Sequence, residues 1–184
     1  MTTAVLVIDM QRGMADRIAA GRAPVNPAAM DRMAALLAGA RAHGIPVIHV
    51  HHDNPDPASP FRKGLPGAEP MACAAPVAGE VVLWKHRSSA FAGTVLDDLL
   101  RRDGIDRLIV AGAVAAFCVT STVRAASDLG YAVLLPTDAL LGFDLPAYDG
   151  GRIDAATVQR VTLSLLGADF ATLTTVAQLA VEAA

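Results

Sequence analysis

Residues 108–135 have the sequence LIVAGAVAAFCVTSTVRAASDLGYAVLL. This stretch begins with a short apolar run, Leu108 to Ala111, which predicts a buried strand. Residues 118–129 then fit a helix that Gly130 stops, and residues 132–135 form a second apolar run. A strand, a helix and a strand in this order predict a βαβ unit with parallel strands.

The same alternation extends along the chain. Further strands are predicted at 5–8, 46–51, 81–84 and 171–174. Further helices are predicted after an Asn26-Pro27 start, from about residue 94 to Gly104, at 154–166, and after a Thr175 cap. About six alternations predict one α/β domain over residues 1–184, a doubly wound three-layer α/β/α sandwich on a mainly parallel sheet.

Composition excludes several classes of protein. Hydrophobic residues make up 53% of the chain but are spread along it, and no run approaches the length of a membrane span. A formal charge of −3 and only 4% aromatic residues argue against a nucleic-acid partner. No basic segment precedes the first apolar run, and two cysteines give no disulfide framework, so we expect a cytoplasmic protein that acts on a small molecule.

One long segment interrupts the alternation. Residues 53–79 are rich in proline and predict an irregular excursion, with prolines at Pro55, Pro57, Pro60, Pro66, Pro70 and Pro76. Long loops in compact domains often serve as pocket walls or lids. We therefore expect this excursion, a loop near 143–150 or a neighbouring subunit to shape the substrate pocket.

Three predicted strands end at residues that can do chemistry. Asp9 follows the first strand, Lys85 follows the third, and Cys118 comes shortly after the fourth. In a doubly wound parallel sheet, ligands bind beyond the carboxyl ends of the strands. All three residues are therefore expected at one edge of the sheet.

Their chemistry is complementary. A thiol becomes a good nucleophile once it loses its proton, and a helix N-terminus and an ammonium group both favour the thiolate. Lys85 can supply the ammonium, and Asp9 can take the thiol proton and return it to a leaving amine. Taken alone, each residue has an ordinary role, as a buried small side chain, a turn cap or a solvated cation. The combination favours acyl transfer.

Several segments together carry a resemblance to a known family. They are Leu6-Val7-Ile8-Asp9-Met10-Gln11, Lys85-His86-Arg87-Ser88-Ser89-Ala90-Phe91, Val110-Ala111-Gly112 through Cys118-Val119, Thr122, Ala125, Gly130-Tyr131 and Asp138-Ala139. In these segments the sequence resembles the isochorismatase-like cysteine hydrolases, which include nicotinamidases and N-carbamoylsarcosine amidohydrolases. The resemblance covers nearly the whole chain. It implies a six-stranded sheet of order 3-2-1-4-5-6 and a homo-oligomer, a dimer or a tetramer.

The resemblance also implies the site. It assigns a triad of Asp9, Lys85 and Cys118, with Cys118 as the nucleophile. It places a cis peptide between Ala113 and Val114, and makes the backbone N–H groups of Val114 and Cys118 candidates for the oxyanion hole. The chain departs from the family pattern at Ala115 and Ala116, where many members carry threonine and often Asp or Asn.

A second departure concerns metal. Nicotinamidases carry an Asp-x-His motif after the second strand, and the aligned stretch here is His52-Asp53-Asn54. His49, His51, His52 and Asp53 could ligate a metal. Strand alternation sends His51 and His52 to opposite faces, however, so we expect no metal and no cofactor. The chain resembles the metal-free amidohydrolases more than the nicotinamidases.

These observations leave three functions to compare. The first is a cysteine hydrolase that cleaves an amide, lactam, carbamoyl or ureido C–N bond. The second is isochorismate-type vinyl-ether hydrolysis, which occurs in relatives that lack the cysteine, and the third is a non-catalytic flavodoxin-like binding module. The cysteine and its two partners favour the first. Candidate pocket residues are Gln11, Phe61, Trp84, Arg87, Ala115, Phe117 and Phe143.

Overall fold

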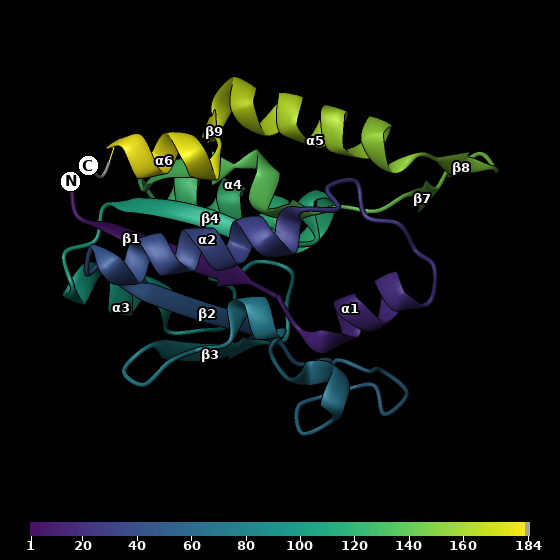
Figure 1. Cartoon of the computed structure of the whole chain (residues 1–184), viewed down its shortest axis with the longest axis horizontal. Helices are drawn as coiled ribbons and strands as arrows, with labels where there is room; N and C mark the ends of the chain where they lie inside the picture. The colour runs from purple at the N-terminus through teal and green to yellow at the C-terminus, as the bar shows by residue number, and fades with distance from the viewer. Residues whose placement is uncertain (183–184) are drawn as a thin grey trace.

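A parallel sheet forms the centre of the protein (Figure 1). The computed structural model describes residues 1–182. The sheet order is β3-β2-β1-β4-β5-β9, with β6 beside the end of β4, and every paired strand is parallel. This confirms the predicted fold class and strand order. The strands are β1 (Thr3–Ile8), β2 (Val47–His52), β3 (Val81–Lys85), β4 (Arg107–Ala113), β5 (Ala132–Pro136), β6 (Leu140–Leu141) and β9 (Thr172–Thr174).

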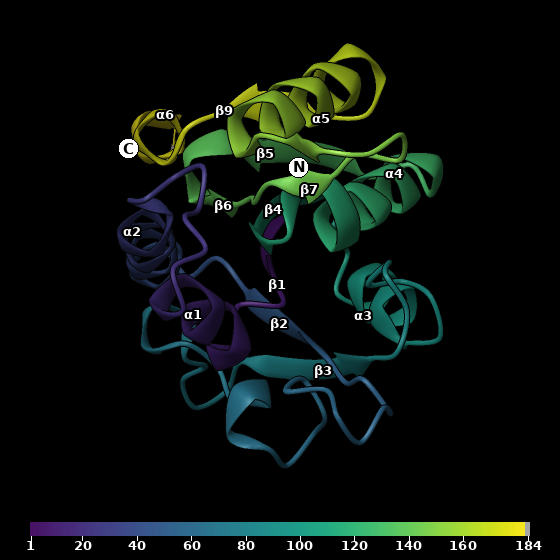
Figure 2. The ribbon, with the colours of Figure 1, turned by 90° about the vertical axis from the view of Figure 1, so that its right-hand side faces the viewer.

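Helices cover both faces of this sheet (Figure 2). One face of the sheet, called the α2 face below, packs against α1 (Arg12–Ala19), α2 (Ala29–Ala42) and α6 (Val176–Glu182). The opposite face, called the α4 face, packs against α3 (Leu96–Arg102), α4 (Thr120–Asp128) and α5 (Ala155–Asp169). Side chains alternate between the two cores along each strand, so Val47 lies on the α2 face and Ile48 on the α4 face. No helix in the described part of the chain is long and apolar enough to cross a membrane.

One helix and two helix boundaries differ from the sequence-based predictions. Helix α1 was not predicted at all. Asn26 does not cap α2, which begins at Ala29, because its side-chain amide instead donates to the carbonyls of Thr137 (2.8 Å) and Leu140 (3.0 Å). Cys118 does not begin α4, because it lies within a π-helical turn, Ala115–Val119, that precedes the first residue of α4.

The proline-rich excursion is packed onto the domain. It contains two short 3₁₀ turns, Pro66–Ala68 and Ala72–Ala74, which contact α1 and α2 respectively. Its backbone is bonded to the segment after β1, since Met71 N–H donates to the Met10 carbonyl at 2.8 Å. Buried side chains within it include Phe61, Ala68, Met71 and Ala74. The excursion therefore belongs to the α2-face core.

Strands β1 and β4 approach closely at the edge where the order reverses. Gly112 of β4 has a φ of 129°, and a Cβ at this position would lie 2.1 Å from the carbonyl oxygen of Ile8. Only glycine allows this backbone conformation and this approach. The chain segments that follow β1 and β4 consequently leave the sheet side by side.

A small hairpin extends beyond this edge (Figure 1). It consists of β7 (Leu145–Pro146) and β8 (Arg152–Ile153), which pair antiparallel before α5 begins. Asp144 accepts hydrogen bonds from Arg22 and Arg152, which tie the hairpin to the loop after α1. Asp154 caps α5, which follows the hairpin, by accepting a hydrogen bond from Thr157 N–H at 2.8 Å. Earlier in the chain, a 3₁₀ turn at Thr137–Ala139 precedes β6.

Candidate active site

Asp9 and Lys85 form a buried ion pair at the carboxyl edge of the sheet. Lys85 Nζ lies 2.9 Å from Asp9 Oδ2 and also donates to the Arg87 carbonyl at 3.1 Å. Lys85 is fully buried, and Asp9 is 2% exposed. A charged pair without solvent is costly unless its geometry is good, and these contacts satisfy the ammonium group from two sides.

The backbone at Asp9 explains how the pair forms. Lys85 ends β3 opposite His52, on the α4 face. Regular alternation after Ile8 would turn residue 9 toward the α2 face. Asp9 instead has a φ of 49°, a left-handed conformation that aspartate tolerates better than most residues. This turn allows its carboxylate to meet Lys85.

Cys118 lies beside this pair. It belongs to the π-helical turn between β4 and α4, and it is partly exposed. Burial, and then the negative charge of Asp9, raise the pKa of the Cys118 thiol to about 12, although the charge of Lys85 opposes them. The sequence-based expectation that Lys85 stabilises the thiolate stays a prediction. Cys118 lies in the π-helical turn that runs into α4 and not at the first residue of α4, which begins at Thr120.

Asp9 is placed to receive a proton. Burial raises its pKa, while the charge of Lys85 and hydrogen bonds from Lys85 and Cys118 oppose the shift. Its Oδ2 is occupied by Lys85, but no nitrogen or oxygen donor within residues 1–182 reaches the buried Oδ1. A carboxylate with a raised pKa and one free oxygen is suited to act as a general base near neutral pH.

The turn before Cys118 is held by its own carbonyl groups. The peptide bond between Ala113 and Val114 is cis. The Val114 carbonyl accepts from Phe117 N–H at 2.9 Å, and the Ala115 carbonyl accepts from Thr120 Oγ1 at 2.7 Å. Ala115 itself is buried. These contacts fix the turn without using the side chains that many family members carry at positions 115 and 116.

Gln11 is a buried clamp. Its side-chain nitrogen donates to the carbonyls of His52 and Ala68, both at 2.9 Å, and its oxygen accepts from His52 N–H at 2.9 Å. Both ends of the amide are thus engaged with backbone groups. Gln11 joins the end of β2 to the excursion, which differs from its expected place in a substrate pocket.

The other pocket candidates separate by exposure. Phe61 and Phe143 are buried beneath Arg17 and Arg22, in the α2-face core. Trp84 packs edge-on against His51, on the face opposite Lys85. All three rings thus have packing partners, and their predicted pocket role stays a prediction.

Two candidates stay accessible. Phe117, next to Cys118, is 50% exposed, so it is the most exposed aromatic ring among the pocket candidates. Arg87 is exposed as well, and the group it contributes to the ion pair is its carbonyl.

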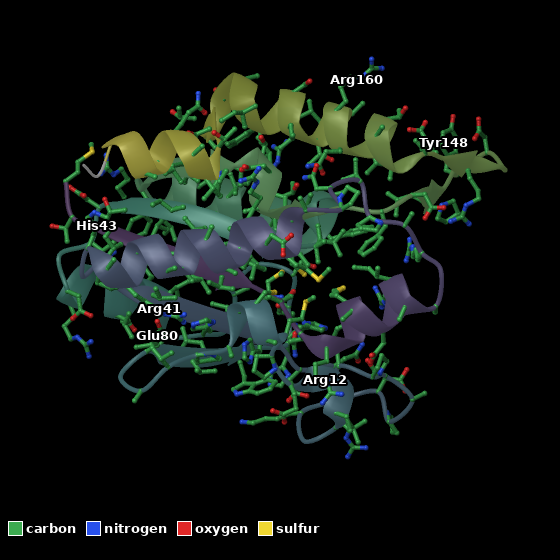
Figure 3. The ribbon with its side chains drawn as sticks, in the orientation of Figure 1. Arg12, Arg41, His43, Glu80, Tyr148 and Arg160 are labelled. Carbon is green, nitrogen blue, oxygen red and sulfur yellow. The ribbon has the colours of Figure 1, made fainter. Side chains whose placement is uncertain are left out.

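The histidines of β2 divide between the two faces. His49 Nε2 lies 2.9 Å from Glu80 Oε2, and Arg41 also binds Glu80 (Figure 3). His51 packs on Trp84, whereas His52 lies opposite Lys85 in register. Within residues 1–182 no group of three or more histidine, cysteine, aspartate or glutamate side chains is arranged to hold a metal ion. The metal-free expectation stays a prediction.

Comparison with known proteins identifies the family to which this fold and site belong. Fold and site define a doubly wound α/β protein whose polar cluster lies at the point where the strand order reverses. Residues 3–178 match the isochorismatase domain, and the chain belongs to the isochorismatase family of hydrolases.

Individual relatives cover most of the chain. It is 29% identical over 176 residues to the isochorismatase family protein YrdC of Bacillus subtilis, covering 96% of this chain and 93% of that protein. It is 33% identical over 146 residues to maleamate amidohydrolase of Pseudomonas putida, covering 72% and 68% respectively. A crystal structure of an isochorismatase-family hydrolase from Chromobacterium violaceum superposes with a TM-score of 0.94 at 35% identity, covering 99% of this chain and 93% of that one.

Proposed function

We propose that this protein hydrolyses a small amide, lactam, carbamoyl or ureido compound through a Cys118 thioester. The observation that carries the proposal is the buried Asp9–Lys85 pair, 2.9 Å apart, beside the thiol of Cys118. A thiol, a base with a free oxygen and a fixed cation are the parts that covalent acyl transfer requires. The likeness to maleamate amidohydrolase supports a C–N bond as the target.

The first half of the reaction begins with the thiol. Asp9 takes the proton from Cys118 as the sulfur attacks the carbonyl carbon of the substrate. The negative charge that develops on the carbonyl oxygen is met by the backbone N–H groups of Val114 and Cys118. Asp9 then gives the proton to the leaving nitrogen, the C–N bond breaks, and a thioester and a free amine or ammonia result.

The second half reverses these roles. Asp9 takes a proton from water as the water oxygen attacks the thioester, the C–S bond breaks, and the proton returns to sulfur. Lys85 stabilises the negative charge on the sulfur and on the Asp9 carboxylate that it contacts. No metal or cofactor takes part in the proposed sequence.

The test is turnover of a panel of small amides, lactams and ureides, measured as release of ammonia or amine. Cys118→Ala should lower kcat by about 10⁴-fold or more on any compound that the wild type cleaves. Cys73→Ala, the matched control, should keep wild-type turnover because Cys73 lies in the excursion. Full turnover by Cys118→Ala would refute the assignment of Cys118 as the nucleophile.

A further inference from the structure

The methionines of this chain gather in one of its two cores. The sequence contains six methionines, and one of them is the first residue. The other five all belong to the α2-face core and form the methionine cluster: Met10, Met14, Met30, Met33 and Met71. Four of them are buried, and Met30 is partly buried at the margin. The α4-face core contains no methionine among residues 1–182. In Figure 3 the yellow sulfur atoms accordingly gather between α1 and α2.

The cluster lies where the excursion rests on the domain. Met14 belongs to α1, Met33 to α2 and Met71 to the excursion itself. The two 3₁₀ turns on either side of Met71 contact α1 and α2. Phe61, a further large side chain that the excursion buries, belongs to the same core and packs so closely on α1 that a Cβ at Gly13 would lie 2.9 Å from its ring. Phe61 and Met71 are thus the side chains through which the excursion enters the cluster.

The excursion is also bonded to the chain beside both members of the ion pair. Its first residue, Asp53, donates its N–H to the carbonyl of Lys85 at 2.8 Å. Met71 N–H donates to the carbonyl of Met10, the residue after Asp9, also at 2.8 Å. The excursion therefore borders the candidate active site at Asp9 and at Lys85. Between the two attachments, residues 54–67 form the part of the excursion that can shift beside the site.

Methionine gives a core a different property from leucine or isoleucine. Its side chain is unbranched, has three rotatable bonds and fills gaps of varying shape at little cost. Branched side chains fit one arrangement of their neighbours well and oppose a shift of the element packed on them. The α4-face core, which supports the turn of Cys118, consists mainly of alanine, valine, leucine and isoleucine. The nucleophile thus rests on a rigid core and the excursion on an adaptable one.

We propose that the methionine cluster makes the excursion an adjustable wall of the substrate pocket, so that Cys118 accepts amides whose non-reacting parts differ in size. This inference rests on the proposed function, because it concerns the compounds that reach Cys118. New rotamers in the cluster let Phe61 and Met71 shift with the excursion, while Asp9, Lys85 and Cys118 keep their geometry. The substrate is accordingly a class of amides of varied size and not one compound of fixed shape.

Alkylation of Cys118 by reagents of two sizes tests the adjustable wall without any turnover. Iodoacetamide and iodoacetanilide transfer the same reacting carbon, and the second carries a phenyl ring on its nitrogen. Peptide mass spectrometry measures the ratio of their labelling rates at Cys118 separately from Cys73. In the wild type the anilide-to-amide ratio should lie within about threefold of that of free cysteine, because the wall moves aside at little cost.

Branched side chains in the cluster should remove this tolerance. Met14→Leu/Met33→Leu/Met71→Leu nearly keeps the volume of the core, and the ratio should fall by about three- to tenfold while the rate with iodoacetamide stays unchanged. Backbone hydrogen exchange in residues 54–67 should slow in this variant, and exchange in β4 should stay as in the wild type. Met71→Leu alone, which alters a side chain of the excursion itself, carries the test if the triple variant does not fold.

Norleucine provides the matched control. It replaces the sulfur of methionine by a CH₂ group and keeps the unbranched chain. Protein in which norleucine replaces every methionine should therefore keep the wild-type ratio of the two labelling rates. This control separates the flexibility of the side chains from the chemistry of their sulfur atoms.

Three results would overturn the proposal. One is a wild-type Cys118 that reacts with iodoacetamide and rejects iodoacetanilide. Another is an unchanged ratio, or unchanged hydrogen exchange in residues 54–67, in leucine variants that melt at the wild-type temperature. The third is a loss in the norleucine protein equal to that in the leucine variants. None of them depends on the turnover panel, so a failure of the proposed hydrolysis is recognised separately.

Discussion

The two faces of β2 bury polar side chains in different ways. On the α2 face, His49 binds Glu80 and His51 packs on Trp84. On the α4 face, His52 lies in register with Lys85, which binds Asp9 beside Cys118, and the second carboxylate oxygen of Asp9 has no hydrogen-bond partner among residues 1–182. One strand thus contributes a structural set and a reactive set of side chains.

The charge balance of the two sets differs accordingly. Against the cost of burial, hydrogen bonds from Arg41, from Val77 N–H and from His49 lower the pKa of Glu80 to about 2, so this carboxylate stays ionised. Burial dominates at Asp9 and raises its pKa. A carboxylate surrounded by donors stabilises structure, whereas one that is left partly unsatisfied can exchange a proton.

The largest effect should come from breaking the reactive set at Lys85. Lys85→Met leaves the Asp9 carboxylate buried without its cation, so we expect the free energy of unfolding to fall by about 3–5 kcal/mol in urea titrations at neutral pH. The double variant Asp9→Asn/Lys85→Met should regain part of this loss, since both charges are gone. A single variant as stable as the wild type would contradict the buried pair.

Acid should act mainly on the structural set. Burial, and then the charge of His49, lower the pKa of His51 to about 4 from 6.5. The unfolded chain therefore binds a proton more readily, and the stability contributed by neutral His51 is complete above pH 6.5 and is lost as pH falls toward 4. The loss should reach about 3 kcal/mol.

Melting curves across this range check the acid effect. His51→Leu should flatten the dependence of stability on pH, while His43→Leu should keep the wild-type slope. An unchanged slope in His51→Leu would mean that the pKa of His51 is the same in the folded and the unfolded chain.

Removal of the Gln11 side chain, which joins the end of β2 to the excursion, should have an intermediate effect on stability. Gln11→Leu leaves the His52 N–H and the Ala68 carbonyl without partners, at a cost of about 2 kcal/mol. Limited proteolysis should then cut within residues 53–79 sooner than in the wild type. Unchanged proteolysis would show that the buried Phe61 and Met71 hold the excursion without Gln11.

The smallest effect is expected at Cys73. Its side chain is half-buried and packs at the margin of the α2-face core. Cys73→Ala should change the melting temperature only slightly, by less than about 1 kcal/mol in stability. A large destabilisation would show that the turn at Ala72–Ala74, which contacts α2, is needed to hold the excursion.

The sequence was sufficient for the sheet because its strands are short apolar runs separated by glycine and proline. Residues 5–8, 81–84 and 108–111 all lie within observed strands. The polar residues that follow them were predicted to meet because parallel strands end at one edge. Asp9 and Lys85 do so.

Properties that depend on tertiary contacts were not predictable. The N-cap role expected of Asn26 fails because carbonyls at Thr137 and Leu140, distant in sequence, take its side chain. The protonation of Cys118 depends on how far Lys85 is neutralised by Asp9, which no spacing reveals. The position of His52 opposite Lys85 had one usable signal, the alternation that separates it from His51.

The Gln11 clamp has a consequence for protein engineering. The excursion is attached to the end of β2 through the backbone of Ala68 and His52, and its buried Phe61 and Met71 anchor it in the α2-face core. A loop grafted from another family member between β2 and β3 must therefore supply a carbonyl in place of that of Ala68 and apolar side chains in place of Phe61 and Met71. Such a graft would exchange the loop and leave Asp9, Lys85 and Cys118 unchanged.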